Sequence, residues 1–126
     1  MPDMTPRLPH GKGCVRPLIY GPTALESMLD FLPGARCARR VIHATGGIHA
    51  EIEIDDSILV LELADPPYPG KTPGSVIVYV DDVDGTVRRA ESRGFRLTRG
   101  PVTRPYGERV ASVADQFGNT WWLCSV

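Results

Sequence analysis

A chain of 126 residues is the size of one small domain, and its composition leaves few functional classes open. The formal net charge is −1 and the basic residues are scattered among acidic ones, so nothing favours binding to nucleic acid or to an anionic membrane surface. No apolar run approaches the roughly 20 residues of a membrane span, and the proline-rich start lacks the apolar centre of a signal peptide. We therefore expect a flexible N-terminal tail over residues 1–13 and a cytoplasmic protein.

The first half of the chain, residues 14–65, has the pattern of a strand, a helix and three further strands. Val15–Tyr20 is strand-like, and Pro22 stands where the first turn of a helix tolerates proline. Apolar residues then recur on one helical face until Pro33-Gly34 ends the helix. These residues are Ala24, Leu25, Met28, Leu29 and Leu32.

The last two strands of this half are predicted to form a hairpin between Ile48 and Leu63. Asp55-Asp56 can make a two-residue turn, so that Ile54 faces Ser57 and His49 faces Glu62. Because side chains alternate along strands, one face is then wholly apolar and should lie under the helices. That face carries Ile48, Ala50, Ile52, Ile54, Leu59, Leu61 and Leu63. The opposite face is either wet or the lining of a ligand cleft, and it carries His49, Glu51, Glu53, Ile58, Val60 and Glu62.

A linker, residues 66–73, separates this half from the next, because its prolines remove backbone donors and fix the backbone. The second half, residues 74–126, repeats the pattern. Ser75–Val80 is strand-like, Asp81-Asp82 offers N-capping carboxylates, and Gly94 ends the helix before three further strands.

Identical residues recur in the two halves at a spacing of sixty. The pairs are Gly34 and Gly94, Arg36 and Arg96, Arg39 and Arg99, Gly47 and Gly107, Asp55 and Asp115, and Leu63 and Leu123. A fixed period indicates one structural unit used twice. We predict an α+β fold in which residues 14–126 form a single domain of two βαβββ modules, which pair into a curved sheet that encloses a cleft.

The sixty-residue offset also predicts the cleft face of the second module. It places Arg109, Ala111, Val113, Thr120, Trp122 and Cys124 on the cleft side, joined by Ser75, Ile77 and Tyr79 from the first strand of this module. It assigns Val110, Ser112, Ala114, Trp121 and Leu123 to the helix side. An apolar wall with a few polar groups is typical of a small-molecule pocket, although Trp122 and Tyr79 could also fill a core.

The chain resembles the glyoxalase, bleomycin-resistance and extradiol-dioxygenase superfamily, also called vicinal oxygen chelate. Beside the paired modules, the resemblance rests on three motifs that cover Val80–Asp84, Arg104–Arg109 and Asp115–Trp122. The resemblance implies the fold but not the activity, because the superfamily includes isomerases, dioxygenases, epimerases, thiol transferases and metal-free drug-sequestering proteins.

Metalloenzymes of that superfamily hold a divalent ion with four side chains, usually His or Gln and Glu. Carried onto this chain, the four positions fall at Val15, Glu62, Ser75 and Trp122. Only Glu62 is a competent ligand, so we expect the usual metal site to be lost and no metal cofactor.

Glu62 and His49 remain as candidate catalytic residues. They could form a structural ion pair, act in acid–base chemistry, or bind an ion together with Glu51. The two other histidines, His10 in the tail and His43 on an edge strand, have no partner visible in the sequence.

Two functions stay open, and binding is favoured over catalysis. In the first, Tyr79 and Trp122 stack on a small hydrophobic or aromatic molecule while Glu62, His49 and Arg109 orient its polar groups, as in the drug-sequestering and resistance proteins of the superfamily. The other ligand-binding residues expected in this pocket are Ser75, Ile77 and Val60. In the second, a metal-independent lyase or isomerase uses Glu62 with His49 as the base, and Arg109 stabilises negative charge. Superfamily members commonly form homodimers, so we also expect a homodimer in which two chains form the pocket.

Overall fold

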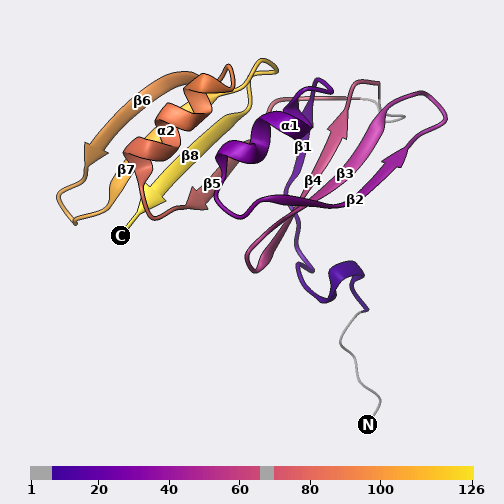
Figure 1. The fold of residues 1–126 in the computed structure, drawn as a ribbon, viewed down its shortest axis with the longest axis horizontal. Coiled ribbons are helices and arrows are strands. Elements are labelled where there is room, and N and C mark those ends of the chain that lie inside the picture. The colour runs from indigo at the N-terminus through magenta and orange to yellow at the C-terminus, as the bar shows by residue number, and fades with distance from the viewer. Residues whose placement is uncertain (1–6, 66–69) are drawn as a thin grey trace, which may run out of the picture.

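The structure, a computed structural model, describes residues 7–65 and 70–126, which form two modules of the same architecture (Figure 1). The first contains β1 (Leu18–Gly21), α1 (Leu25–Met28), the 3-10 turn η2 (Leu29–Phe31), β2 (Arg36–Ile42), β3 (Ile48–Ile54) and β4 (Ser57–Leu63). The second contains β5 (Ser75–Tyr79), α2 (Val83–Ser92), β6 (Arg96–Thr103), β7 (Arg109–Ala114) and β8 (Thr120–Ser125). The predicted α+β fold of two βαβββ modules is confirmed.

Each module forms one four-stranded sheet, with the strand orders β1-β4-β3-β2 and β5-β8-β7-β6. The first strand of each module is parallel to the last, and the remaining pairs are antiparallel. The two sheets lie side by side in Figure 1, with α1 and α2 in front of them. Within the described ranges, every strand ladder joins strands of the same module.

One hydrophobic core runs through both modules beneath the helices. Phe31, at the end of η2, packs against Phe95 with tilted rings whose centroids are 4.7 Å apart, and Phe95 contacts Trp121 edge-on at 6.4 Å. Trp121 is fully buried and donates its indole N–H to Asp115. A polar link crosses the same boundary, because Asn119 donates to the backbone carbonyl of Tyr20 at 2.8 Å. The modules are therefore held together by packing and by a partly buried hydrogen bond.

The hairpin of the first module has the predicted register. Ile54 pairs with Ser57 and His49 with Glu62 across the turn at Asp55-Asp56. The apolar face lies in the core as expected, with Ile54 partly buried at its end.

Two elements of the first module are shorter than the sequence predicts. β1 begins at Leu18 rather than Val15, because Pro17 has no N–H to offer a ladder; Val15 is 86% exposed. The predicted helix is split into one α-helical turn and the 3-10 turn η2.

The predicted face of β7 is wrong. Trp122 pairs with Ser112, so the residues on the side of Trp122 are Val110, Ser112 and Ala114. Ala111 and Val113 lie in the core with Trp121 and Leu123, and Arg109 shares their face. The cause is the turn: five residues separate Ala114 from Thr120, whereas two separate Ile54 from Ser57. A difference of three residues is odd, and an odd shift exchanges the two faces of a strand.

The predicted linker, residues 66–73, falls partly outside the described residues, which omit 66–69. The described cysteines Cys14, Cys37 and Cys124 are free thiols. In the described part of the chain, no helix has both the length and the apolar character needed to cross a bilayer.

Candidate functional site

The outward face of β3 and β4 brings Glu51, Glu62 and His49 into contact. His49 Nδ1 lies 2.7 Å from Glu62 Oε1, and His49 Nε2 lies 2.6 Å from Glu51 Oε2. Carboxylate oxygens only accept, so both ring nitrogens of His49 donate when the two glutamates are ionised, and the ring is then an imidazolium. Glu62 and His49, which the sequence predicts to be neighbours, are thus in hydrogen-bond contact, and Glu51 also contacts His49.

The other two histidines of the chain extend this contact into a row of five side chains. His43 Nε2 lies 2.9 Å from Glu62 Oε2, and His10 Nε2 lies 2.7 Å from Glu51 Oε1. Each carboxylate oxygen in the row therefore faces a different imidazole nitrogen. We call this set the His–Glu row; its order is His43, Glu62, His49, Glu51, His10.

The His–Glu row was only partly foreseen from the sequence, which offered His43 and His10 no partner. His43 could have been placed by alternation, because Val41 pairs with His49 and His43 lies two residues further along the same face. His10 could not, since its contact with Glu51 spans 41 residues and depends on how the N-terminal segment folds back.

The electrostatics of the row favour its charged forms. Burial by itself would lower the pKa of His49, but hydrogen bonds and charge attraction from Glu51 and Glu62 outweigh it and raise that pKa above 6.5. Burial acts on Glu51 in the opposite sense, yet hydrogen bonds from His49 and His10 lower its pKa below 4.5. Both shifts favour an imidazolium at His49 beside an ionised Glu51.

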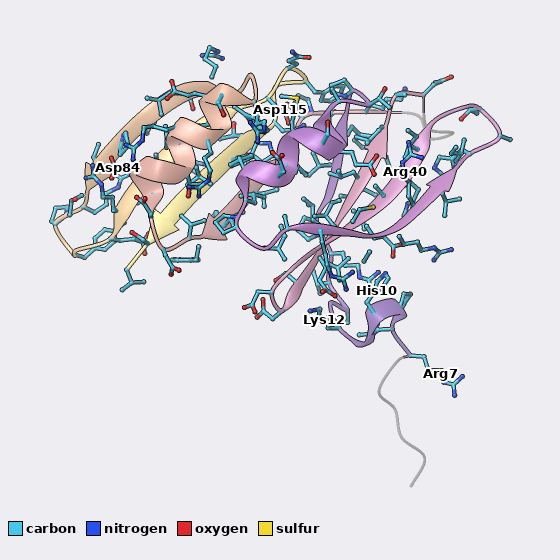
Figure 2. The ribbon with its side chains drawn as sticks, in the orientation of Figure 1. Arg7, His10, Lys12, Arg40, Asp84 and Asp115 are labelled. Atoms are coloured by element: carbon cyan, nitrogen blue, oxygen red, sulfur yellow. The ribbon has the colours of Figure 1, made fainter. Side chains whose placement is uncertain are left out.

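The two carboxylates of this row are buried, whereas its histidines are partly exposed. Glu62 is 2% exposed and Glu51 is 4% exposed. Figure 2 shows His10 and Lys12 on the N-terminal segment where it passes the hairpin of the first module. Lys12 Nζ lies 3.4 Å from Glu53 Oε2 and also donates to the backbone carbonyl of Asp55. His10 and Lys12, which the sequence places in the tail, thus contact the sheet; the flexibility of residues 1–13 stays a prediction.

The corresponding face of the second module is aromatic and open. Ile77 pairs with Trp122 and Tyr79 with Cys124 on neighbouring parallel strands, so these side chains share one face. Ile77 is 65% exposed and Tyr79 is 62% exposed, whereas Trp122 is half-buried. Ser75 begins the same face and is exposed. Four of the predicted ligand-binding residues are therefore brought together.

The polar group beside this face is Glu108, which accepts from the hydroxyl of Tyr79 at 3.3 Å. The charge of Glu108 raises the pKa of Tyr79, and burial, with Glu108 nearby, raises the pKa of the Cys124 thiol. Both groups are therefore neutral at physiological pH.

A pocket of about 530 Å³ lies where the two modules meet. The second module contributes Ile77 and Tyr79, and the first contributes the hairpin turn and the start of β4, including Ile58. The segment before β1 supplies a third wall, formed by Gly13, Val15 and Pro17. Two predicted ligand-binding residues thus line a pocket, while Val60 is buried on the face of the His–Glu row.

Arg109 does not lie on the cleft side, contrary to the prediction. Its guanidinium makes two hydrogen bonds, 2.7 and 2.8 Å long, to the carboxylate of Asp84 on α2. This ion pair lowers the pKa of Asp84 and raises that of Arg109. The odd shift of β7 described above places Arg109 there.

The four positions carried over for a metal offer few donor atoms in their folded surroundings. Val15 lies ahead of β1, and the β1 residue that pairs with Glu62 is Tyr20. Trp122 pairs with Ile77, and both oxygens of Glu62 already face imidazole nitrogens. Across residues 7–65 and 70–126, no group of three or more His, Cys, Asp or Glu side chains is arranged to hold a metal ion.

Comparison with known families identifies the chain. A model of the Glyoxalase/Bleomycin resistance protein/Dioxygenase superfamily matches residues 29–123. The chain belongs to this superfamily. No curated protein sequence matches it.

Solved structures of similar architecture include members of the same superfamily. TioX from Micromonospora sp. ML1 is 27% identical with a TM-score of 0.71, over 90% of this chain and 97% of TioX. A glyoxalase/bleomycin resistance protein/dioxygenase family enzyme from Burkholderia phytofirmans PsJN is 17% identical with a TM-score of 0.69, over 90% and 98% of the two chains. Lactoylglutathione lyase from Agrobacterium tumefaciens is 17% identical with a TM-score of 0.58, over 87% and 90%. The last two similarities concern the fold alone.

Proposed function

We propose that this superfamily member binds a small hydrophobic or aromatic molecule, in a sequestering or resistance role, without the usual metal site. The observation that carries the proposal is the exposed wall of β5. Ile77 and Tyr79 present large apolar surface to a pocket of about 530 Å³, and Trp122 lies beside Ile77 on the same face. Exposed aromatic surface beside a concave pocket is typical of small-molecule sites.

The chemistry of the donor set supports binding without a metal. Val15 and Trp122 have no metal-binding atom, and Ser75 offers only a neutral hydroxyl. Glu62 is the one anionic ligand among the four, and its oxygens are engaged by His43 and His49. Divalent ions need several oxygen or imidazole ligands in a suitable geometry, which these residues do not supply.

Acid–base catalysis as a lyase or isomerase is the second candidate, and the His–Glu row favours it. The 2.7 Å contact between His49 and Glu62 is the geometry of a base with its orienting partner. A substrate would reach Glu62 only after its surroundings rearranged, because that side chain is 2% exposed and both of its oxygens face histidines. Arg109, bound to Asp84 on the helix side, would not stabilise charge there.

Two substitutions discriminate between the candidates. Trp122→Ala should weaken the binding of planar hydrophobic compounds by about tenfold or more, because stacking surface is lost, while Glu62→Gln should change affinity little. Fluorescence titration against a panel of aromatic compounds measures both. Turnover that disappears in Glu62→Gln while ligand is retained would establish the enzyme instead, and an unchanged affinity in Trp122→Ala would remove the aromatic wall from the site.

We also propose that the protein is a homodimer. Each sheet leaves two edge strands, and the face of the second module is open, so a second chain could cover surface that this chain leaves exposed. Light scattering at micromolar concentration should give twice the 13.8 kDa of one chain. A mass near 13.8 kDa would refute the dimer.

A further inference from the structure

The segment that contacts one end of the His–Glu row at Glu51, residues 9–16, is folded around the single side chain of Arg16. Arg16 donates from Nε to the carbonyl of Gly13 at 2.7 Å, and from its terminal nitrogen to the carbonyls of Pro9 and Lys12 at 2.7 and 2.9 Å. The segment therefore keeps its own shape and does not depend on the sheet for these hydrogen bonds.

Its attachment to the sheet is made chiefly by two basic side chains. His10 contacts Glu51 and Lys12 contacts Glu53, on alternate residues of β3. Gly13 lies against Ile58, where an added Cβ would come within 3.1 Å of the isoleucine Cγ1. The first backbone contact with β4 follows only at Pro17, whose carbonyl accepts from Val60 N. Such an attachment can be released without breaking a strand ladder.

The contacts of the segment show which chemistry the covered face accepts. The segment brings a nitrogen base to Glu51, an ammonium group to Glu53 and a close-packed backbone to Ile58. Gly13, Val15 and Pro17 also form one wall of the pocket between the modules, so release of the segment would join the pocket to the carboxylate face.

We propose that residues 9–16 are a displaceable latch over the carboxylate face of the first module, and that the ligand which replaces the latch is a protonated nitrogen base carried on an apolar or aromatic body. This ligand class specifies which small molecules the proposed binding function would take, and it rests on that proposed function. The latch itself rests only on the contacts of His10, Lys12 and Arg16.

The decisive comparison is between His10→Ala and Glu51→Gln in the full chain. Both substitutions weaken the same latch contact, but only His10→Ala keeps the Glu51 carboxylate and leaves its Oε1 open to a cationic ligand, while Oε2 stays paired with His49. With proflavine as a cationic planar probe, we expect His10→Ala to lower Kd at least about fivefold, while Glu51→Gln gives no gain. With anilinonaphthalene sulfonate as an anionic aromatic probe, neither substitution should improve binding.

Hydrogen exchange measured by mass spectrometry tests the latch without any ligand. Exchange of the amides in residues 9–16 should be faster in His10→Ala than in the wild type, and proflavine should accelerate it in the wild type. Arg7→Ala is the matched control, because it removes a positive charge from an exposed position just before the segment. Unchanged exchange in His10→Ala, or proflavine binding without faster exchange, would overturn the latch.

A second pair of variants keeps the test valid if Glu51→Gln does not fold. Lys12→Ala and Glu53→Gln make a similar comparison at the less buried contact, which does not touch His49; there Lys12→Ala opens Glu53 Oε2, while Oε1 stays paired with Arg36. Equal gains of proflavine affinity in both members of either pair would overturn the ligand class. If Trp122→Ala leaves proflavine affinity unchanged while His10→Ala raises it, the aromatic wall is not part of the site and the latch is supported. If Trp122→Ala lowers proflavine affinity while His10→Ala does not raise it, the proposed binding function is supported and the latch is overturned.

Discussion

The two modules share an architecture but present opposite kinds of surface. On the first, three carboxylates and an imidazole share a face that the chain itself covers, and Glu62 is almost fully buried. On the second, the equivalent face carries Ile77, Tyr79 and Trp122, and it is largely open. A duplicated fold can therefore keep its core while its two faces take different roles, because the side chains that point away from the core are free to differ.

The two hairpin turns show the same divergence at a pair of positions sixty residues apart. Asp55 stands at the exposed tip of a two-residue turn and has a φ of 50°. Asp115 is buried in a five-residue turn, where it accepts from the backbone amides of Phe117 and Asn119 and from the side chains of Asn119 and Trp121. The two positions carry the same residue type, but Asp55 is solvated whereas Asp115 organises the boundary between the modules.

The largest expected effect sharpens this contrast. Asp115→Asn should lower the free energy of unfolding by about 2–4 kcal/mol, because an amide cannot accept all four hydrogen bonds and places an N–H₂ group against buried donors. Asp55→Asn makes the same chemical change at the equivalent position and should have an effect within about 0.5 kcal/mol, since asparagine tolerates positive φ. Urea unfolding of both variants measures the difference, and equal losses would show that the two turns are equivalent after all.

A smaller effect depends on pH and belongs to the first module alone. His49→Gln should lower the free energy of unfolding by about 1–3 kcal/mol near pH 6, because charged hydrogen bonds to Glu51 and Glu62 are lost. The folded pKa of His49 is raised, so its stabilising contribution is complete below pH 6.5 and is lost as pH rises through the folded pKa.

Glu51, in the same row, contributes stability with the opposite dependence on pH. The folded pKa of Glu51 is lowered, so its contribution is present above pH 4.5 and is lost as pH falls through the folded value. The stability difference between the wild type and His49→Gln should therefore be largest between about pH 5 and 6.5. Denaturation curves collected from pH 4 to 9 would contradict the assignment if this difference grew towards alkaline pH.

The smallest effect concerns the second module and tests the corrected face of β7. Arg109→Ala should cause a small loss of stability, because its ion pair with Asp84 is exposed to water, and it should leave ligand affinity unchanged within about twofold. Asp84→Asn is the matched control and should reproduce the loss of stability. A loss of affinity in Arg109→Ala alone would return Arg109 to the ligand site.

The error in the face of β7, and with it the error at Arg109, has one identifiable cause. The period of sixty residues located both modules correctly, and alternation fixed the register of the first hairpin, where the turn has only two residues. The same offset failed for Arg109, because a turn three residues longer exchanges the faces of β7. Local patterns determine which face is apolar, but a repeat does not transmit side-chain direction across turns of unequal length.

The sequence by itself determined the fold class, the duplication and the contact between His49 and Glu62, while the linker over residues 66–73 stays a prediction. These follow from periodicity, proline and short turns, whose effects are local in the chain. Only the tertiary structure decided that His10 meets Glu51, that Asn119 reaches Tyr20, and that residues 9–16 lie against the carboxylates of Glu51 and Glu53 on β3. Contacts between residues so far apart in the chain depend on the path of the whole backbone and on which buried charges need a partner, and neither is written in any local pattern.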